Sequence, residues 1–304
     1  MQSSLAIETS GLRKSYGRVQ ALRGLNLEVR QGEIFGFLGP NGAGKTTTIR
    51  CLLDLIRPNG GTARVLGLDP QAASVEVRRR VGYLPGELRL DENLSVDGVL
   101  RYLNHLRGGK ADWKSVRDLC ARLDLDPKLV VKNLSKGNKQ KIGVVQALMH
   151  RPALLMMDEP TFGLDPLMQR EVLRLLWEAK SDGSTVFFSS HILSEVQEVA
   201  ERVAIIRQGV VVEVADTASL INRALRRVRV SFSQPVDLSG LLSVPRIRLL
   251  SQEPTSALVE VEGEIDALVK ALAAYPLRDL ETERPSLEEI FLAYYTTGGK
   301  EAAQ

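Results

Sequence analysis

A glycine-rich segment near residue 40 has the residue types and spacing that bind a phosphate chain. Residues 39–46 fit the pattern G-x-x-x-x-G-K-[ST] and lie between a predicted strand and a predicted helix. In such a loop, backbone N–H groups converge on phosphate oxygens, the Lys45 ammonium neutralises phosphate charge, and the Thr46 hydroxyl can ligate Mg²⁺. The sequence therefore predicts a nucleoside triphosphate site formed by Gly39, Pro40, Asn41, Gly42, Ala43, Gly44, Lys45, Thr46 and Thr47.

Two carboxylates follow residues 153–157, an apolar run that predicts a parallel strand buried on both faces. They are Asp158 and Glu159, and they lie at the strand edge where open α/β sheets bind ligands. A solvated acidic turn would explain the pair alone, but not beside a phosphate loop. We expect Asp158 to hold Mg²⁺ with Thr46, and Glu159 to act as the general base on an attacking water. The pair predicts hydrolysis rather than binding alone.

The elements that must position these motifs alternate between strand and helix, which indicates an α/β fold. Residues 5–29 show the period-2 alternation of antiparallel strands, and residues 88–150 predict a helical insertion. Further strands are predicted at 33–38, 153–157, 185–189, 203–207 and 210–214, and helices at 45–56, 96–107, 113–123, 135–150, 167–180 and 193–201.

Two domains are predicted, at residues 1–219 and 220–304. In the second, strands at 227–232, 246–251, 257–261 and 278–283 and helices at 238–242 and 265–274 follow one another as βαββαβ. This order predicts a small ferredoxin-like α+β domain, and a capping box predicts a closing helix at 286–295. The domain carries no catalytic pairing, so we expect it to regulate or to support a dimer; a purely stabilising role is the alternative.

Charge and cysteine content exclude several classes of protein. Lys plus Arg number 40 and Asp plus Glu 37, a balance that argues against a nucleic-acid partner. No run approaches the roughly 18 apolar residues of a membrane span, and residues 1–10 lack the features of a signal peptide, so we expect a cytoplasmic protein. Cys51 and Cys120 lack the spacing of a disulfide framework or a zinc site.

Four further segments lie at defined places before and after these motifs. Residues 134–140, Leu-Ser-Lys-Gly-Asn-Lys-Gln, precede the strand that ends in Asp158, and residues 163–166, Gly-Leu-Asp-Pro, follow it. Tyr16 lies before the phosphate loop, and His191 follows a predicted buried strand. Taken in chain order, these segments resemble the motifs of an ATP-binding cassette (ABC) transporter ATPase. Tyr16 resembles the adenine-stacking aromatic, residues 134–140 the LSGGQ signature, residues 163–166 the D-loop and His191 the switch histidine. Residues 134–140 and 83–87, Tyr-Leu-Pro-Gly-Glu, are most similar to the bacterial exporters of drugs, peptides and natural products.

The resemblance implies site residues that the local patterns do not assign. It implies that ATP, with Mg²⁺, stacks on Tyr16 and that His191 contacts the γ-phosphate and keeps the water and Glu159 aligned. Ser135 and Gly137 would reach the nucleotide across a head-to-tail dimer, and Asp165 belongs to the D-loop beside it. The second cassette would be another copy or a paralogue. A separate transmembrane permease would dock around residues 82–94, which places the chain on the inner face of the cell membrane.

Two departures from the family pattern matter. Lys136 and Asn138 replace a glycine and the glutamine of the signature, while Ser135 and Gly137 are retained, so binding across the dimer is expected to survive. At the Q-loop, the place of the glutamine is taken by Gly86, followed by Glu87. Either Glu87 substitutes for the glutamine, or the loop serves only to sense the membrane partner.

Three functions compete on these observations. The leading hypothesis is an ATP-hydrolysing subunit that powers a membrane exporter through ATP-driven dimerisation. The alternative is an ABC ATPase that acts on ribosomes or DNA, although such proteins usually carry two cassettes or a long coiled insertion. A nucleotide-binding regulator without turnover is disfavoured because Lys45, Asp158, Glu159 and His191 are all present.

Overall fold

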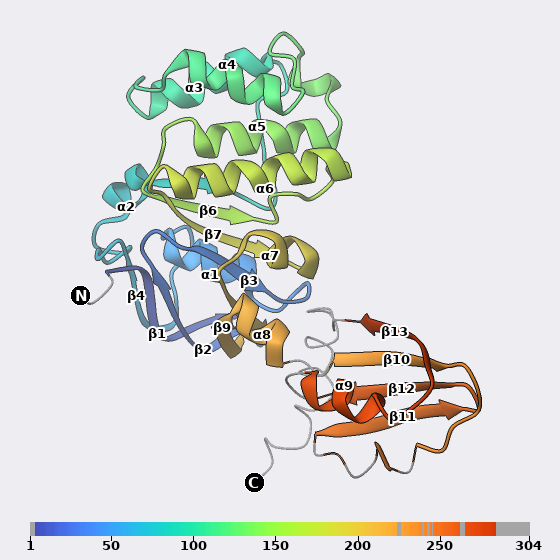
Figure 1. Cartoon of the computed structure of the whole chain (residues 1–304). Coiled ribbons are helices and arrows are strands. Elements are labelled where there is room, and N and C mark those ends of the chain that lie inside the picture. Colours follow the sequence, from blue (N-terminus) through green and yellow to red (C-terminus); the bar gives the residue numbers. More distant parts are fainter. Residues whose placement is uncertain are drawn as a thin grey trace. The chain divides into compact units, whose positions relative to one another are not determined.

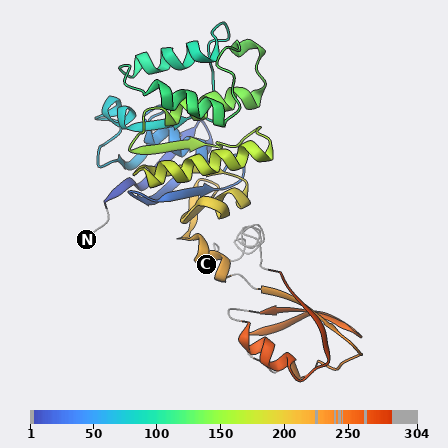
Figure 2. The same ribbon diagram turned by 45° about the horizontal axis from the view of Figure 1, so that its top comes forward.

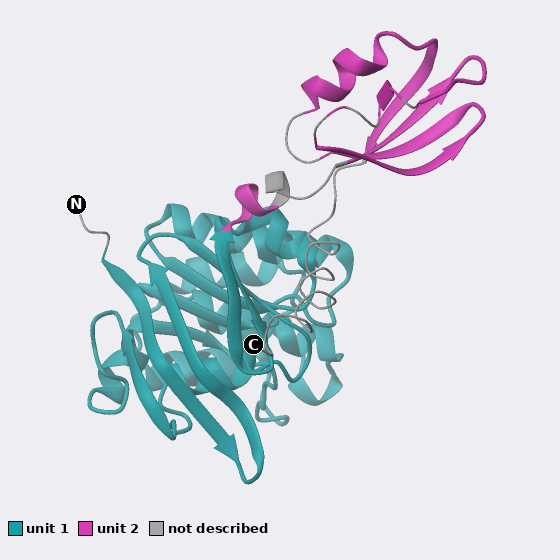
Figure 3. Ribbon diagram, turned by 90° about the horizontal axis from the view of Figure 1, so that it is seen from below, with its two compact units in different colours: residues 1–215 teal, residues 216–304 magenta. Residues whose placement is uncertain are grey.

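The structure, a computed structural model, describes residues 4–223, 226–238, 240–241, 244, 246–261 and 265–283. The chain forms two compact units, residues 1–215 and 216–304 (Figures 1 and 3). The predicted boundary at 219/220 differs by a few residues because helix α8 (Thr217–Arg223) directly follows the last strand of unit 1 and belongs to unit 2. No helix within the described ranges is both long and apolar enough to cross a membrane.

A six-stranded sheet forms the centre of unit 1, in the order β5-β6-β7-β3-β8-β9. From β5 to β8, each neighbouring pair is parallel. Every residue of β3, β6 and β7 is buried, as their apolar sequences predict. The strands are β3 (Ile34–Leu38), β5 (Val81–Leu84), β6 (Leu154–Asp158), β7 (Thr185–Ser190), β8 (Arg202–Arg207) and β9 (Val210–Asp216).

A second, antiparallel sheet of three strands packs in the same unit. It joins β1 (Leu5–Tyr16) to β2 (Val19–Arg30) on one side and to β4 (Gly60–Val65) on the other. Strand β4 is not among the predicted strands, and its segment opens with two glycines. One of them, Gly61, has φ of +77°, and a Cβ there would lie 2.3 Å from the carbonyl oxygen of Gly11. The glycine thus marks a close backbone approach rather than the end of an element.

Helices cover both faces of the central sheet. Helix α1 (Lys45–Leu52) lies between the two sheets, where Ile49 and Leu52 join a core that contains Phe35, Phe37 and Phe187. It ends earlier than the predicted residue 56, since the chain leaves helical geometry at Asp54, whose φ is +50°. Helix α2 (Ser74–Arg80) contacts β5, and α6 (Pro166–Ser181) and α7 (Leu193–Val199) pack on β3 and β7. Helix α7 lies on the opposite face from α1, because a Cβ on Gly36 would meet Val196.

The predicted helical insertion is present at the end of unit 1 that carries α3 and α4 (Figures 1 and 2). Side-chain caps at Ser95, Asp112 and Ser135 accept backbone N–H bonds and define where the helices begin. Arg122 binds Glu171 and Glu178, which ties this insertion to α6. Its elements are α3 (Val96–Leu106), α4 (Trp113–Arg122), the 3-10 turn η1 (Val131–Asn133) and α5 (Lys136–Leu148).

Unit 2 contains a four-stranded antiparallel sheet in the order β11-β12-β10-β13. One face of this sheet carries Val228, Val230 and Val259, which pack with Leu268 and Leu272 of α9 into a separate core. The predicted closing helix at 286–295 lies outside the described residues. The elements are β10 (Arg226–Phe232), β11 (Ile247–Glu253), β12 (Ser256–Val261), α9 (Asp266–Leu272) and β13 (Leu277–Glu283).

Candidate nucleotide site

The phosphate loop runs from the end of β3 to the start of α1, as predicted. Its glycines meet two physical requirements. Gly42 and Gly44 have φ of +80° and +114°, in the left-handed region that favours glycine. A Cβ on Gly39 would lie 2.6 Å from the carbonyl oxygen of Ile206, so only glycine fits there. The loop therefore curls tightly against β8 and brings its backbone to the beginning of α1, where N–H groups lack partners within the helix.

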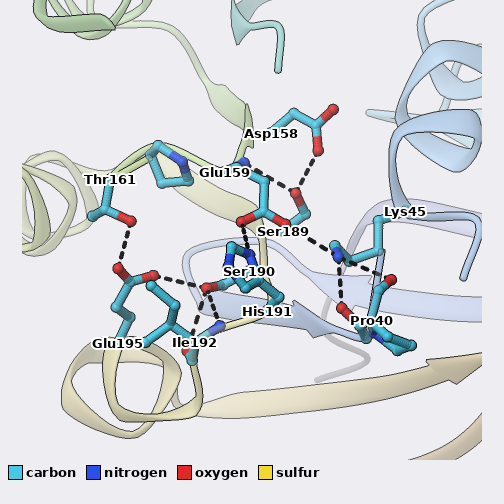
Figure 4. A network of polar contacts seen from close by, with 12 residues as sticks. Pro40, Lys45, Asp158, Glu159, Thr161, Ser189, Ser190, His191, Ile192 and Glu195 are labelled. Atoms are coloured by element: carbon cyan, nitrogen blue, oxygen red, sulfur yellow. Dashed lines mark hydrogen bonds and ion pairs between the residues drawn. The ribbon is translucent and has the colours of Figure 1, made fainter. Parts of the chain in front are cut away.

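Lys45 lies inside this loop with 6% of its side chain exposed. Its Nζ donates to the carbonyl oxygen of Gly39 at 2.6 Å and to that of Pro40 at 3.3 Å. It also lies 3.1 Å from Oε1 of Glu159, an ion pair without the alignment of a hydrogen bond (Figure 4). The loop and Glu159 thus hold the ammonium beside the backbone of the predicted phosphate loop.

Asp158 is fully buried at the end of β6 and receives two hydroxyl donors. Thr46 Oγ1 donates to Oδ2 at 2.6 Å, and Ser189 Oγ, from the neighbouring strand β7, donates to Oδ1 at 2.5 Å. The hydroxyl and carboxylate oxygens are hard donors of the kind that Mg²⁺ prefers. No cluster of three or more His, Cys, Asp or Glu side chains suited to a metal occurs among the described residues. Thr46 and Asp158 fit Mg²⁺, which usually takes one or two protein oxygens together with substrate phosphates.

Glu159 has the unusual backbone angle φ of +53°. A non-glycine residue in this region is sterically costly, and neighbouring contacts must hold it there. Ser189 supplies them, because its carbonyl and its Oγ accept from the Glu159 N–H at 3.2 Å and 3.1 Å. The resulting turn directs the carboxylate to His191, whose Nδ1 lies 2.6 Å from Oε2 (Figure 4). An ionised carboxylate only accepts, so this contact places the imidazole proton on Nδ1.

The other predicted nucleotide residues form separate groups. Ser135 caps α5, and a Cβ on Gly137 would lie 2.6 Å from the carbonyl oxygen of Gly163, which packs the signature segment against the D-loop. Asp165 caps α6 by accepting from Leu167 and Met168 N–H groups. Tyr16 is exposed at the β1–β2 turn, beneath Lys14 Nζ. Among the hydrogen bonds and ion pairs of the described residues, none joins Tyr16, Ser135 or Asp165 to the phosphate loop.

At the Q-loop, Gly86 lies against the buried carboxylate. A Cβ at this position would lie 3.0 Å from Asp158 Oδ2, which is tighter than an ordinary contact. Glu87, the next residue, is exposed. The departure from the family pattern therefore leaves backbone, rather than a side chain, beside Asp158.

Sequence reasoning missed several polar side chains that hold the site together. Ser189 organises both Asp158 and Glu159, and Gln140 of α5 donates to the carbonyl oxygens of Glu159 and Pro160. Glu195 of α7 is buried and accepts hydroxyl bonds from Thr161 and Ser190. The available signal was the pair of serines, Ser189 and Ser190, at the end of a buried strand, since buried polar groups need partners.

The comparisons with known proteins are consistent with this geometry. The ABC transporter family model matches residues 22–162. The daunorubicin/doxorubicin resistance ATP-binding protein DrrA of Streptomyces peucetius is 34% identical, over 96% of this chain and 93% of its own. The chain belongs to the ABC transporter ATP-binding proteins. The bacitracin transport ATP-binding protein BcrA of Bacillus licheniformis is 40% identical over 69% of each chain.

Solved structures agree with the fold of this ABC protein. The ATP-binding subunit of an ABC transporter superposes with a TM-score of 0.65 at 28% identity, over 71% of this chain and 91% of its own. A dimeric ABC cassette bound to ADP and Pi superposes with a TM-score of 0.63 over 69% of this chain and 98% of its own, at 22% identity. The predicted family, its drug and natural-product exporter branch, the P-loop α/β core and the use of ATP are confirmed.

Proposed function

We propose that this ABC protein hydrolyses ATP, with Mg²⁺, to power a membrane exporter of a drug or natural product. The observation that carries the proposal is a single contact network, in which Lys45, Thr46, Asp158, Glu159 and His191 meet although they come from three different strand ends. A site that only bound nucleotide would not need a carboxylate aligned by an imidazole beside the phosphate loop.

Each residue of the network has a distinct task. The loop N–H groups and Lys45 bind the β- and γ-phosphates, and Tyr16 stacks on adenine. Thr46 and Asp158 would hold Mg²⁺, which neutralises phosphate charge when bound. Glu159 accepts a proton from the attacking water, while His191 orients Glu159 through the 2.6 Å contact, which leaves the other ring nitrogen for the γ-phosphate.

The site is completed by a second cassette. Ser135 and Gly137 begin α5, whose N-terminal N–H groups are suited to a phosphate of the opposing nucleotide. Asp165 and the D-loop pack against the same segment through Gly137 and Gly163. Two cassettes, either two copies or this chain with a paralogue, therefore close head to tail around ATP and separate after hydrolysis.

A transmembrane permease is the partner that uses this cycle, and it holds the chain on the inner face of the membrane. DrrA and BcrA, named for drug resistance and bacitracin transport, support this proposal over action on ribosomes or DNA. The DrrA alignment extends over both units, which supports an exporter role for a chain that carries the C-terminal unit. That unit stabilises the dimer or regulates it.

The test is Mg²⁺-dependent ATP turnover by the full chain, compared with Glu159→Gln. The variant keeps the phosphate loop but loses the base, so it should bind ATP and accumulate as a closed dimer in size analysis. Removal of a general base should lower kcat by roughly 10²- to 10⁴-fold. Turnover of Glu159→Gln at the wild-type rate would show that Glu159 is not the base.

A further inference from the structure

Glu195 lies in α7, one helical turn beyond the site, and no step of the proposed hydrolysis uses it. Its side chain is 5% exposed. A buried carboxylate costs free energy unless specific partners compensate, and an apolar residue would pack α7 at lower cost. Its presence therefore calls for a role other than packing.

The two oxygens of this carboxylate bind two different segments. Thr161 Oγ1 donates to Oε1 at 2.5 Å, and Ser190 Oγ donates to Oε2 at 2.7 Å (Figure 4). Ser190 Oγ also accepts from the N–H of Ile192 at 2.9 Å, so both sides of this hydroxyl are fixed. Thr161 is only 2% exposed, so water cannot replace Glu195 as the hydrogen-bond partner of its hydroxyl.

These two segments are the ones that carry Glu159 and His191. Thr161 lies two residues after Glu159 in the turn that follows β6, and Ser190 directly precedes His191 at the end of β7. One oxygen of Glu195 therefore binds the segment that carries Glu159, and the other binds the segment that carries His191. Glu159 and His191 also contact each other, at 2.6 Å. Figure 4 shows the two Glu195 contacts together with the contact between Glu159 and His191.

We propose that Glu195 is a positioning residue for ATP hydrolysis: it braces the turn that carries Glu159 against the strand end that carries His191. The inference rests on the proposed function of that pair. Without the brace, Glu159 and His191 keep their chemistry but lose their fixed separation, so turnover falls while ATP binding at the phosphate loop persists.

The surroundings of Glu195 act on its ionised form in opposite directions. Burial raises the pKa of Glu195, and the negative charge of nearby Glu159 raises it further, whereas the Thr161 and Ser190 hydroxyl bonds lower it. The two hydroxyls therefore stabilise the ionised form, in which both oxygens accept and the brace is complete. His191 is the other titratable group that faces this carboxylate.

Two kinds of variant test the brace, one that keeps the Glu195 charge and one that removes it. Thr161→Val keeps the shape and the Glu195 carboxylate but deletes one donor, whereas Thr161→Ser keeps the donor. Glu195→Gln removes the charge, and Glu198→Gln, at an exposed position on the same helix, is the matched control. Steady-state kinetics, ATP affinity and thermal unfolding are measured for each full-length variant.

We expect Thr161→Val and Glu195→Gln each to lower kcat about tenfold, less than the roughly hundredfold cost of a 1 Å misplacement, with KM within about twofold. Thr161→Ser and Glu198→Gln should retain wild-type kcat. The double variant should be no slower than the slower single one, because both changes break the same bridge. Wild-type kcat in Thr161→Val, or additive losses in the double variant, would overturn the proposal.

A second measurement does not depend on turnover. The ¹⁵N shifts of the His191 ring, assigned with His191→Gln, report which nitrogen carries the proton. The wild-type ring should favour the Nδ1–H form that Glu159 binds, and Thr161→Val should shift it toward Nε2–H. An unchanged tautomer would refute the brace even in a protein that turned over no ATP, whereas absent wild-type turnover would refute the proposed function alone.

Discussion

His191 Nδ1 lies 2.6 Å from Glu159 Oε2, although the two residues follow different strands of the central sheet. The strands β6 and β7 are neighbours in parallel register, with Asp158 opposite Ser189. Their carboxyl ends therefore emerge together, and the first side chains beyond them face each other. The contact is a property of the sheet order rather than of either motif alone.

Lys45→Ala should weaken ATP binding by roughly 10- to 100-fold, the loss expected for a hydrogen bond to a charged group. Lys45 Nζ is the cation that the loop holds beside Glu159, and alanine removes it without disturbing the loop glycines. Equilibrium binding of a fluorescent ATP analogue measures the effect, with the exposed Lys128→Ala as control. Undiminished affinity would refute the assignment of the phosphate loop.

Gly86→Ala should raise the Mg²⁺ concentration that supports half-maximal ATP hydrolysis. The added Cβ would lie 3.0 Å from Asp158 Oδ2, the oxygen that also accepts from Thr46. Overpacking costs about 1 kcal/mol or more, so the shift should be on the order of fivefold. Gly86→Gln, which restores the family's glutamine, should raise this Mg²⁺ concentration at least as much. Faster ATP hydrolysis in Gly86→Gln than in the wild type would contradict the prediction.

Glu87→Gln separates the two Q-loop hypotheses. If Glu87 substitutes for the missing glutamine, the isolated ATPase should slow by about tenfold or more, within the lower part of the range for acid–base groups. Because Glu87 is exposed while Gly86 lies against Asp158, we expect the rate to change by less than about twofold. A large loss in the isolated chain would assign the role to Glu87.

Glu195→Gln should become more stable relative to the wild type as the pH rises. Burial raises the pKa of Glu195 above its unfolded value of about 4.3, so its contribution to stability is complete below that pH and is lost as the pH rises through the folded pKa. Glutamine has no such loss. Urea unfolding at about pH 4 and about pH 8, on either side of the titration, tests the sign, with Glu198→Gln as control. A variant that loses relative stability at high pH would contradict it.

Truncation after Thr217 should leave ATP affinity within about twofold of the full chain, as expected of a change remote from the site. Unit 1 has its own core, and β9 ends at Asp216. Dimer formation in size analysis and coupling to a permease should both weaken if unit 2 supports the dimer. A folded truncated protein that no longer binds ATP would refute the division into two domains.

Local patterns in the sequence determined the motifs and most elements. Apolar runs such as 153–157 predict buried strands because burial on both faces excludes polar side chains. The phosphate loop is equally local, since Gly42 and Gly44 are needed for backbone angles within a few residues. The fold class and the nucleotide could be predicted from such signals, and the family from the resemblance of several motifs in their order along the chain.

Only the tertiary structure decided which distant residues meet. Thr46 and Asp158 are 112 residues apart in the sequence, yet they form a hydrogen bond of 2.6 Å. They meet because they follow β3 and β6, parallel strands with only β7 between them, whose carboxyl ends lie on the same side of the sheet. The hydrogen-bond partners of Ser189 and Glu195 likewise could not be predicted, because no neighbouring residue in the sequence indicates them. Strand β4 was not predicted, because it is defined by its hydrogen bonding to β1 and lacks a regular alternation of buried and exposed residues. Periodicity reports burial, whereas partner choice depends on the order in which strands pack, which no local segment encodes.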